Sequence, residues 1–173
     1  MKKWLMPVLI ITVIIMGVIA FSVYSWAVGF NNTAVEYEEN AKTAWSNVES
    51  SYQRRNDLIG NLVKTVQGAA DFEKETLTDV ISARAKATSV NINAGDLTPE
   101  KMAQFQQAQA GMSGALSKLL VSVERYPELK ANANFLELQS QIEGTENRIN
   151  VTRDRFNAGV TVYNKLIKKF PGS

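Results

Sequence analysis

The N-terminal part of the chain is a long apolar run without a charged residue. From Trp4 to Val35 there is no Asp, Glu, Lys or Arg, and the first part of the run is dense in Ile, Val, Leu and Met. A transmembrane helix needs about 20 apolar residues to cross a hydrocarbon core of roughly 30 Å. Trp4 stands at one end of the run, and Tyr24 and Trp26 stand at the other, where interfacial aromatic residues are expected. The pattern therefore predicts a transmembrane helix over residues 4–28.

A cleaved signal peptide is the alternative interpretation of this run. Lys2 and Lys3 resemble its basic first part, and Ser25-Trp26-Ala27 resembles a weak cleavage site. The apolar part of a signal peptide has about 7–15 residues, which is shorter than the run found here. We therefore favour a retained anchor.

The charges beside the run predict its orientation. Lys2 and Lys3 precede it, whereas Glu36 and two further glutamates follow it before the first cation, Lys42. Lys and Arg are retained preferentially on the cytoplasmic side of a membrane. We therefore expect residues 1–3 in the cytoplasm and the C-terminal part of the chain outside it.

A short polar segment follows the predicted anchor. Residues 29–33 include Asn31 and Asn32, and Thr33 with Glu36 has the spacing of a capping box at a helix start. This pattern predicts a hinge at 29–33 and a second domain over 34–173. One unbroken helix that leaves the membrane is the alternative.

Apolar residues recur at alternating spacings of three and four through most of 34–173, which is typical of a buried helix face. Gly60, the segment 89–96 and Pro127 interrupt the pattern, and Thr98-Pro99-Glu100 carries the signals of a helix start. The predicted fold is all-α: an N-terminal transmembrane helix and a long antiparallel up-and-down helical bundle with heptad-like packing. The expected helices of the bundle are 34–58, 60–88, 98–125 and 128–170, with one kinked helix as the alternative for the first two.

The last predicted helix has the strictest repeat. A large apolar residue occupies every seventh position, and such a row predicts a buried seam with left-handed supercoiled packing. The members of this core row are Phe135, Ile142, Ile149, Phe156, Tyr163 and Phe170.

Polar residues flank this row and also cluster near Gly60. They are candidates for a partly buried network that fixes the register of the helices, and a solvated boundary of the core is the alternative. We expect Asp57 or an arginine beside it to pair with Glu146 or Arg153. The candidate interaction residues are Arg54, Arg55, Asp57, Asn61, Glu146, Arg153 and Asn157.

Composition restricts the chemistry of the chain. It contains no histidine and no cysteine, which excludes disulfides, thiolate metal sites and histidine-dependent catalysis. Without Lys2 and Lys3, the 19 basic residues fall to 17 and equal the 17 acidic ones, so no basic surface for nucleic acid is expected. Glu73, Glu75 and Asp79 leave a carboxylate-only site open, but we interpret them as a solvated helix face. We expect no enzymatic activity, metal or cofactor.

Several segments stand out when they are taken in order along the domain: Ala44-Trp45-Ser46, 54–59, 61–63, 123–131, 134–139, 145–149, Arg153, 156–157, 160–164 and 170–171. Together these segments resemble the bacterial LemA family. Gly60 departs from this family, whose members usually carry proline there, and the members usually continue past Phe170-Pro171 into a short tail of Gly and aromatic residues.

The resemblance implies a single-pass protein of the bacterial inner membrane with a long antiparallel helical bundle and no established activity. Some members are associated with making or shaping internal membranes, and others occur beside membrane proteases. Together with the anchor, this favours a membrane-anchored scaffold that self-associates on the bilayer. The alternative is an adaptor or regulator of another membrane protein, such as a protease.

Three large aromatic residues are candidates for contacts between copies of the chain. Trp45 and Tyr52 lie beside apolar stripes that smaller residues already fill, and Phe105 lies on a helix rich in Ala, Gly and Ser. These positions support a homo-oligomer as the expected assembly. The alternative is that the same residues complete the core of one monomer.

The orientation is testable with the substitutions Thr33→Cys and Ser173→Cys. Both introduced thiols should react with a membrane-impermeant reagent in intact cells, because both positions are predicted to lie outside. The parent chain has no cysteine and serves as the blank. Reaction only after lysis would reverse the predicted orientation.

Overall fold

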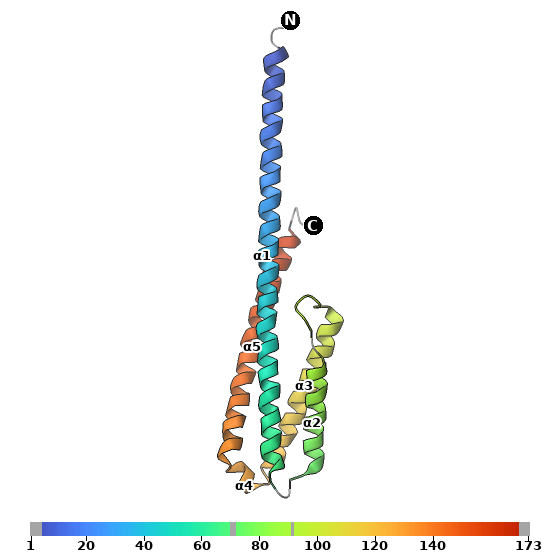
Figure 1. Ribbon diagram of the computed structural model, residues 1–173, viewed down its shortest axis with the longest axis vertical. Coiled ribbons are helices and arrows are strands. Elements are labelled where there is room, and N and C mark those ends of the chain that lie inside the picture. Colours follow the sequence, from blue (N-terminus) through green and yellow to red (C-terminus); the bar gives the residue numbers. More distant parts are fainter. Residues whose placement is uncertain (1–4, 70–71, 91, 170–173) are drawn as a thin grey trace. The chain divides into compact units, whose positions relative to one another are not determined.

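The computed structural model describes residues 5–69, 72–90 and 92–169, and the regular structure in these ranges is entirely α-helical (Figure 1). The helices form a bundle in which the long N-terminal helix packs against the C-terminal helix, so the predicted all-α fold is confirmed. The helices are α1 (Leu5–Gln67), α2 (Lys74–Ser89), α3 (Pro99–Val123), α4 (Pro127–Lys130) and α5 (Ala133–Ile167).

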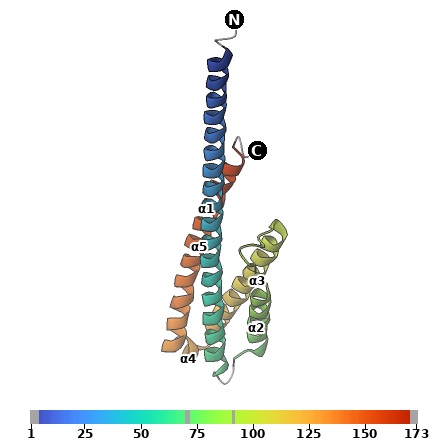
Figure 2. The same ribbon diagram turned by 45° about the horizontal axis from the view of Figure 1, so that its top comes forward.

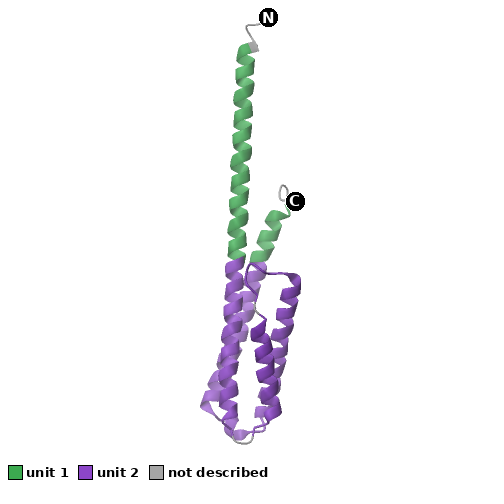
Figure 3. Ribbon diagram, turned by 45° about the vertical axis from the view of Figure 1, so that its right-hand side comes forward, with its two compact units in different colours: residues 1–41, 159–173 green, residues 42–158 purple. Residues whose placement is uncertain are grey.

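The chain divides into two compact units (Figure 3). Unit 1 comprises residues 1–41 and 159–173, and unit 2 comprises residues 42–158. Helices α1 and α5 each contribute to both units. Within unit 1 the two helices come close together at Gly159, where an added Cβ would lie 3.6 Å from the Cα atom of Ala41. This is an ordinary van der Waals distance, so the contact leaves room for a Cβ atom at position 159.

The first part of α1 has the features of a membrane-spanning segment. By length and composition, α1 is the one helix among the described residues that could cross a membrane. Its side chains from 6 to 29 are all exposed. A helix that is apolar on every side has no stable arrangement in water unless other groups cover it. Lys2, Lys3 and Trp4 lie outside the described residues.

Helix α1 continues through 29–33, where the sequence pattern predicts a hinge. The Thr33 hydroxyl donates to the Gly29 carbonyl at 3.0 Å, four residues back, and does not cap a new helix. Such a bond is available to threonine inside a helix. The unbroken helix, which was the alternative, is the arrangement that the structure adopts.

Gly60 also lies inside α1, so the predicted division into helices 34–58 and 60–88 differs from the structure. The chain reverses later, between α1 and α2, where Gly68 N–H donates to Lys64 O at 3.3 Å. A glycine inside a helix costs about 1 kcal/mol relative to alanine, which the other residues of α1 outweigh. Helices α2 and α3 then run side by side (Figures 1 and 2).

The last three helices begin with side-chain or proline signals. Thr98 caps α3 by accepting a hydrogen bond from Lys101 N–H at 3.3 Å, and Pro99 follows at the first helical position. Pro127 opens the short helix α4. The Asn132 side chain then accepts hydrogen bonds from the N–H groups of Asn134 and Phe135, which starts α5. The predicted helix 128–170 is therefore two helices.

The core of unit 2 consists of two clusters. The larger one contains Ile59 and Leu62 of α1 and Leu119 of α3. The smaller one is built on Trp45 and Phe105. The core row of α5 contributes Phe135 and Ile142 to the larger cluster and Ile149 to the smaller one. One row of α5 therefore packs against both parts of the core.

The core row is buried only in part. Phe135, Ile142 and Ile149 are buried, whereas Phe156 and Tyr163 are half-buried. Phe156 packs at the edge of the smaller cluster together with residues of the segment between α2 and α3. Phe170, the last predicted member of the row, lies outside the described residues.

Truncation of Ile149 tests the buried part of the row. Its side chain is 2% exposed, so Ile149→Ala should lower the free energy of unfolding by about 2–5 kcal/mol through lost burial and a residual cavity. Leu136→Ala is the matched control on the same helix, because Leu136 is 49% exposed. Denaturant unfolding of both variants measures the difference. Equal losses would mean that the row does not face the core.

Candidate functional site

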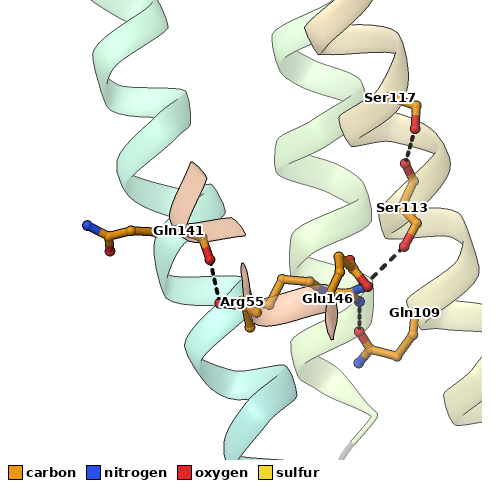
Figure 4. A network of polar contacts seen from close by, with 7 residues as sticks. Arg55, Gln109, Ser113, Ser117, Gln141 and Glu146 are labelled. Atoms are coloured by element: carbon orange, nitrogen blue, oxygen red, sulfur yellow. Dashed lines mark hydrogen bonds and ion pairs between the residues drawn. The ribbon is translucent and has the colours of Figure 1, made fainter. Parts of the chain in front are cut away.

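A buried arginine on α1 is the centre of a polar network between helices (Figure 4). The side chain of Arg55 is 3% exposed. Its Nη1 donates to Glu146 Oε1 of α5 at 2.5 Å and to Ser113 Oγ of α3 at 3.2 Å. Its Nη2 donates to Gln109 Oε1 of α3 at 2.6 Å. One guanidinium group therefore joins three helices.

Two further contacts complete the surroundings of Arg55. Gln109 Nε2 donates to the Ala87 carbonyl at 3.4 Å, which extends the network to α2. The guanidinium carbon lies 5.0 Å from the centre of the Tyr52 ring, within the range of a cation–π interaction. Arg55 Nε is buried and has no hydrogen-bond partner in the structure. The partners of Arg55 are thus arranged around its two terminal nitrogens.

The Arg55–Glu146 pair depends on both of its members. Glu146 is 39% exposed, so it retains water on one side while it neutralises the buried guanidinium. Removal of one partner from a buried pair commonly costs about 3–5 kcal/mol, because the remaining charge is left uncompensated. The pair consequently favours one alignment of α1 against α5, since a shift along either helix would separate the two groups.

Tyr52 connects this network to a second arginine. Its phenol oxygen accepts a hydrogen bond from Arg153 of α5. Burial raises the pKa of the Tyr52 phenol above its ordinary value, and the positive charges of Arg153 and Arg55 oppose this rise. Tyr52 therefore has its ring in the core and its hydroxyl group beside α5.

An aromatic cluster lies next to the network. The Trp45 and Phe105 ring centres are 5.6 Å apart, those of Trp45 and Phe156 are 5.1 Å apart, and those of Tyr52 and Phe105 are 4.9 Å apart. Trp45 Nε1 donates to the Ile92 carbonyl at 2.8 Å, so the indole is both packed and hydrogen-bonded. The buried N–H group of the Trp45 indole therefore has a hydrogen-bond partner.

The prediction that Trp45, Tyr52 and Phe105 form contacts between copies of the chain does not agree with their burial. All three side chains are less than a tenth exposed within one chain. The alternative interpretation, in which they complete the core of a monomer, agrees with the structure. Their apolar surface is already removed from water, so it has little left to contribute to an assembly.

Arg84 of α2 holds α2 against α1. Its Nε donates to the Asn56 carbonyl at 2.8 Å, and its Nη2 lies 3.9 Å from Asp57 Oδ1. A Cβ at Gly60 would come within 3.1 Å of the Arg84 guanidinium. The sequence pattern draws attention to Gly60 as a break, whereas in the structure the glycine provides space for an arginine from another helix.

Glu73 forms a polar cluster near the start of α2. Its carboxylate accepts hydrogen bonds from Ser122 Oγ at 3.1 Å and Thr76 Oγ1 at 3.3 Å, and it pairs with Arg125 at 2.8 Å. The hydrogen bond from Ser122 and the charge of Arg125 lower the pKa of Glu73 below its usual value. Among the described residues no group of three or more acidic side chains could hold a metal ion.

The candidate interaction residues have different positions. Arg55 and Glu146 form the predicted pair, and Arg153 reaches Tyr52. The remaining candidates are exposed, and the two network residues of α3, Gln109 and Ser113, are missing from the prediction. Their signal is weak, because a single Gln and Ser in a helix rich in small residues do not indicate burial. The exposed candidates are Arg54, Asp57, Asn61 and Asn157.

The geometry of the network indicates a structural role. Arg55 contacts a carboxylate, an amide oxygen and a hydroxyl oxygen of the same chain. Buried polar groups that are partnered in this way restrict the number of alternative packings. We interpret the network as a device that selects one register of α1, α3 and α5.

Comparisons with known proteins identify a family and several relatives that the chain resembles. A family model described as LemA family matches residues 44–173. The chain is 28% identical over 159 residues to magnetosome protein MamQ of Magnetospirillum gryphiswaldense, a match that covers 81% of this chain and 58% of the relative. It is 24% identical over 143 residues to protein LemA of Metamycoplasma hominis, covering 83% and 62% of the two chains. The chain spans less than two thirds of the length of these curated relatives.

A double-mutant cycle with Arg55→Met and Glu146→Gln measures the central pair. We expect a coupling energy of about 1–3 kcal/mol, because the two groups are in direct contact in a largely buried position. The matched control pairs Arg54→Met with Glu146→Gln, since the neighbouring Arg54 is exposed and outside the network. Its coupling should stay within about 0.5 kcal/mol. Similar coupling in the two cycles would contradict the network.

Proposed function

The chain belongs to the LemA family, and from this premise we propose that it is a membrane-anchored helical scaffold that self-associates at the membrane and contributes to membrane organisation. The observation that carries the proposal is the composition of α1. One helix supplies both an exposed apolar segment long enough to cross a bilayer and several core residues of unit 2, among them Val48, Ile59 and Leu62. Anchor and bundle therefore belong to the same element.

The relatives support a role in membrane organisation. Proteins named magnetosome protein MamQ occur in two organisms and match about four fifths of this chain. Their names assign them to a bacterial organelle. We propose a corresponding, non-catalytic role at the inner membrane for this chain, with residues 1–3 in the cytoplasm and unit 2 outside.

Self-association has to use surfaces other than the aromatic cluster. Val121 of α3 is 72% exposed and is the most exposed large apolar side chain among the described residues of unit 2. Ile81, Leu136 and Val151 are also exposed there. Tethering in a membrane raises the effective concentration of neighbouring copies, so modest contacts are sufficient for assembly.

Co-purification of two differently tagged copies tests self-association. Both copies are expressed together, crosslinked in native membranes and extracted in mild detergent. We expect each tag to recover the other copy and the complex to be larger than a monomer. Val121→Glu should reduce this recovery at least about tenfold, which corresponds to about 1.4 kcal/mol.

Gln107→Glu is the matched control for this experiment. It lies on the same helix, is exposed and introduces the same charge. It should leave recovery unchanged. A strictly monomeric protein at native expression would contradict the scaffold and favour an adaptor that binds another membrane protein.

A further inference from the structure

A groove of about 540 Å³ lies between α1 and α5 of unit 2. Its charged lining residues are three arginines, Arg54 of α1 and Arg148 and Arg155 of α5. The other polar lining residues include Asn47 and Asn147, and none of the lining residues is acidic. The volume is within the range of about 300–1,000 Å³ that is usual for small-molecule sites.

The guanidinium groups of the three groove arginines have no ion-pair or hydrogen-bond partner among the described residues. Within the described residues, no carboxylate forms an ion pair with Arg54, Arg148 or Arg155, and no hydrogen bond involves their guanidinium groups. The other four arginines each have a partner: Arg55, Arg84 and Arg125 pair with carboxylates. Arg153 donates a hydrogen bond to the Tyr52 phenol oxygen. The three arginines for which the described residues supply no partner therefore all line this groove.

The register of the two helices fixes the spacing of these cations. Trp45 packs on Phe156 and Arg55 pairs with Glu146, so ten residues separate the two contacts on both helices. The helices are therefore antiparallel with a constant offset, and Arg54 lies level with Asn147.

It follows that Arg54 and Arg148 face the groove at nearly the same height, within about 1.5 Å along the helix axis. Arg155 is seven residues beyond Arg148, which is two turns of the same face or about 10 Å. The groove thus has two cations, Arg54 and Arg148, at one level and a third cation, Arg155, two helical turns away.

The floor of the groove is built from small side chains. Ala44 and Ser51 of α1 and Thr152 of α5 line it, and Ser51 and Thr152 satisfy their hydroxyl groups on helix carbonyls. On the opposite side of the same two helices, large aromatic rings and α3 fill the space. The lining of this groove therefore combines small side chains with the three arginines.

We propose that this groove binds an anion with two phosphate groups, either a free diphosphate compound or the headgroup of an anionic phospholipid. Guanidinium groups bind phosphate oxygens in a bidentate geometry. One phosphate is held between Arg54 and Arg148, and the second reaches Arg155, with the amides of Asn47 and Asn147 as additional donors. A single carboxylate would neutralise only one of the three cations.

Titration of inorganic pyrophosphate into the full chain in neutral detergent tests the site. Calorimetry should detect binding to the parent chain, and Arg54→Gln with Arg148→Gln should weaken it at least about tenfold. Arg54→Lys with Arg148→Lys should weaken it less, because the charge remains while the bidentate geometry is lost. Without pyrophosphate, the double glutamine variant should keep or raise the thermal midpoint, since two like charges are removed.

The charge-matched control is Lys64→Gln with Lys118→Gln, because both lysines are exposed and lie outside the groove. This variant should bind pyrophosphate as the parent chain does. Detergent micelles doped with cardiolipin, compared with micelles doped with phosphatidylcholine, provide the lipid probe. Protection of Arg148 from phenylglyoxal locates the bound group.

Binding of pyrophosphate without protection by cardiolipin identifies a free diphosphate as the ligand. Protection by cardiolipin without binding of pyrophosphate identifies the lipid headgroup. The proposal is overturned if neither probe binds. It is also overturned if the control Lys64→Gln with Lys118→Gln loses as much affinity for pyrophosphate as Arg54→Gln with Arg148→Gln. Self-association is measured separately by co-purification, so failure of the groove and failure of the scaffold are distinguishable.

Discussion

The burial of the Arg55 guanidinium is the interaction on which the arrangement of unit 2 depends. A cation inside a helical bundle is unfavourable unless carboxylate, amide and hydroxyl oxygens surround it. Here the oxygens come from α3 and α5, and the amide that contacts Arg55 also reaches α2. Apolar rows alone allow neighbouring registers of similar energy. The cation removes this freedom, because only one register brings all of its partners within hydrogen-bonding distance.

The periodicity of the sequence was sufficient to predict the class of fold and much of the core. The seven-residue row of α5 identifies Phe135, Ile142 and Ile149 as buried, and the charge-free run identifies the apolar part of α1. The same pattern does not determine where helices end. The sequence pattern predicts helix breaks at Gly60 and at residues 29–33, but α1 continues through both. Whether a glycine bends a helix depends on what packs against it, which the local sequence does not record.

The polar network illustrates a second limit of prediction. A link between the arginine-rich segment of α1 and Glu146 of α5 is predictable from complementary charge, whereas the choice of Arg55 over Arg54 depends on a rotation of 100° about the helix axis. The aromatic residues show the same ambiguity. Trp45, Tyr52 and Phe105 fit a monomer core or an interface equally well by pattern, and their mutual ring contacts decide the matter.

The contact between Gly60 and Arg84 has an evolutionary consequence. Any side chain at position 60 would press on the guanidinium that bonds the Asn56 carbonyl. We therefore expect the two positions to be coupled, because a side chain at position 60 requires the Arg84 guanidinium to shift by a few tenths of an ångström or to be replaced. Divergent relatives should show correlated replacement at these two sites, and a chain with a ring or branched residue at the first should have exchanged the arginine at the second for a smaller residue.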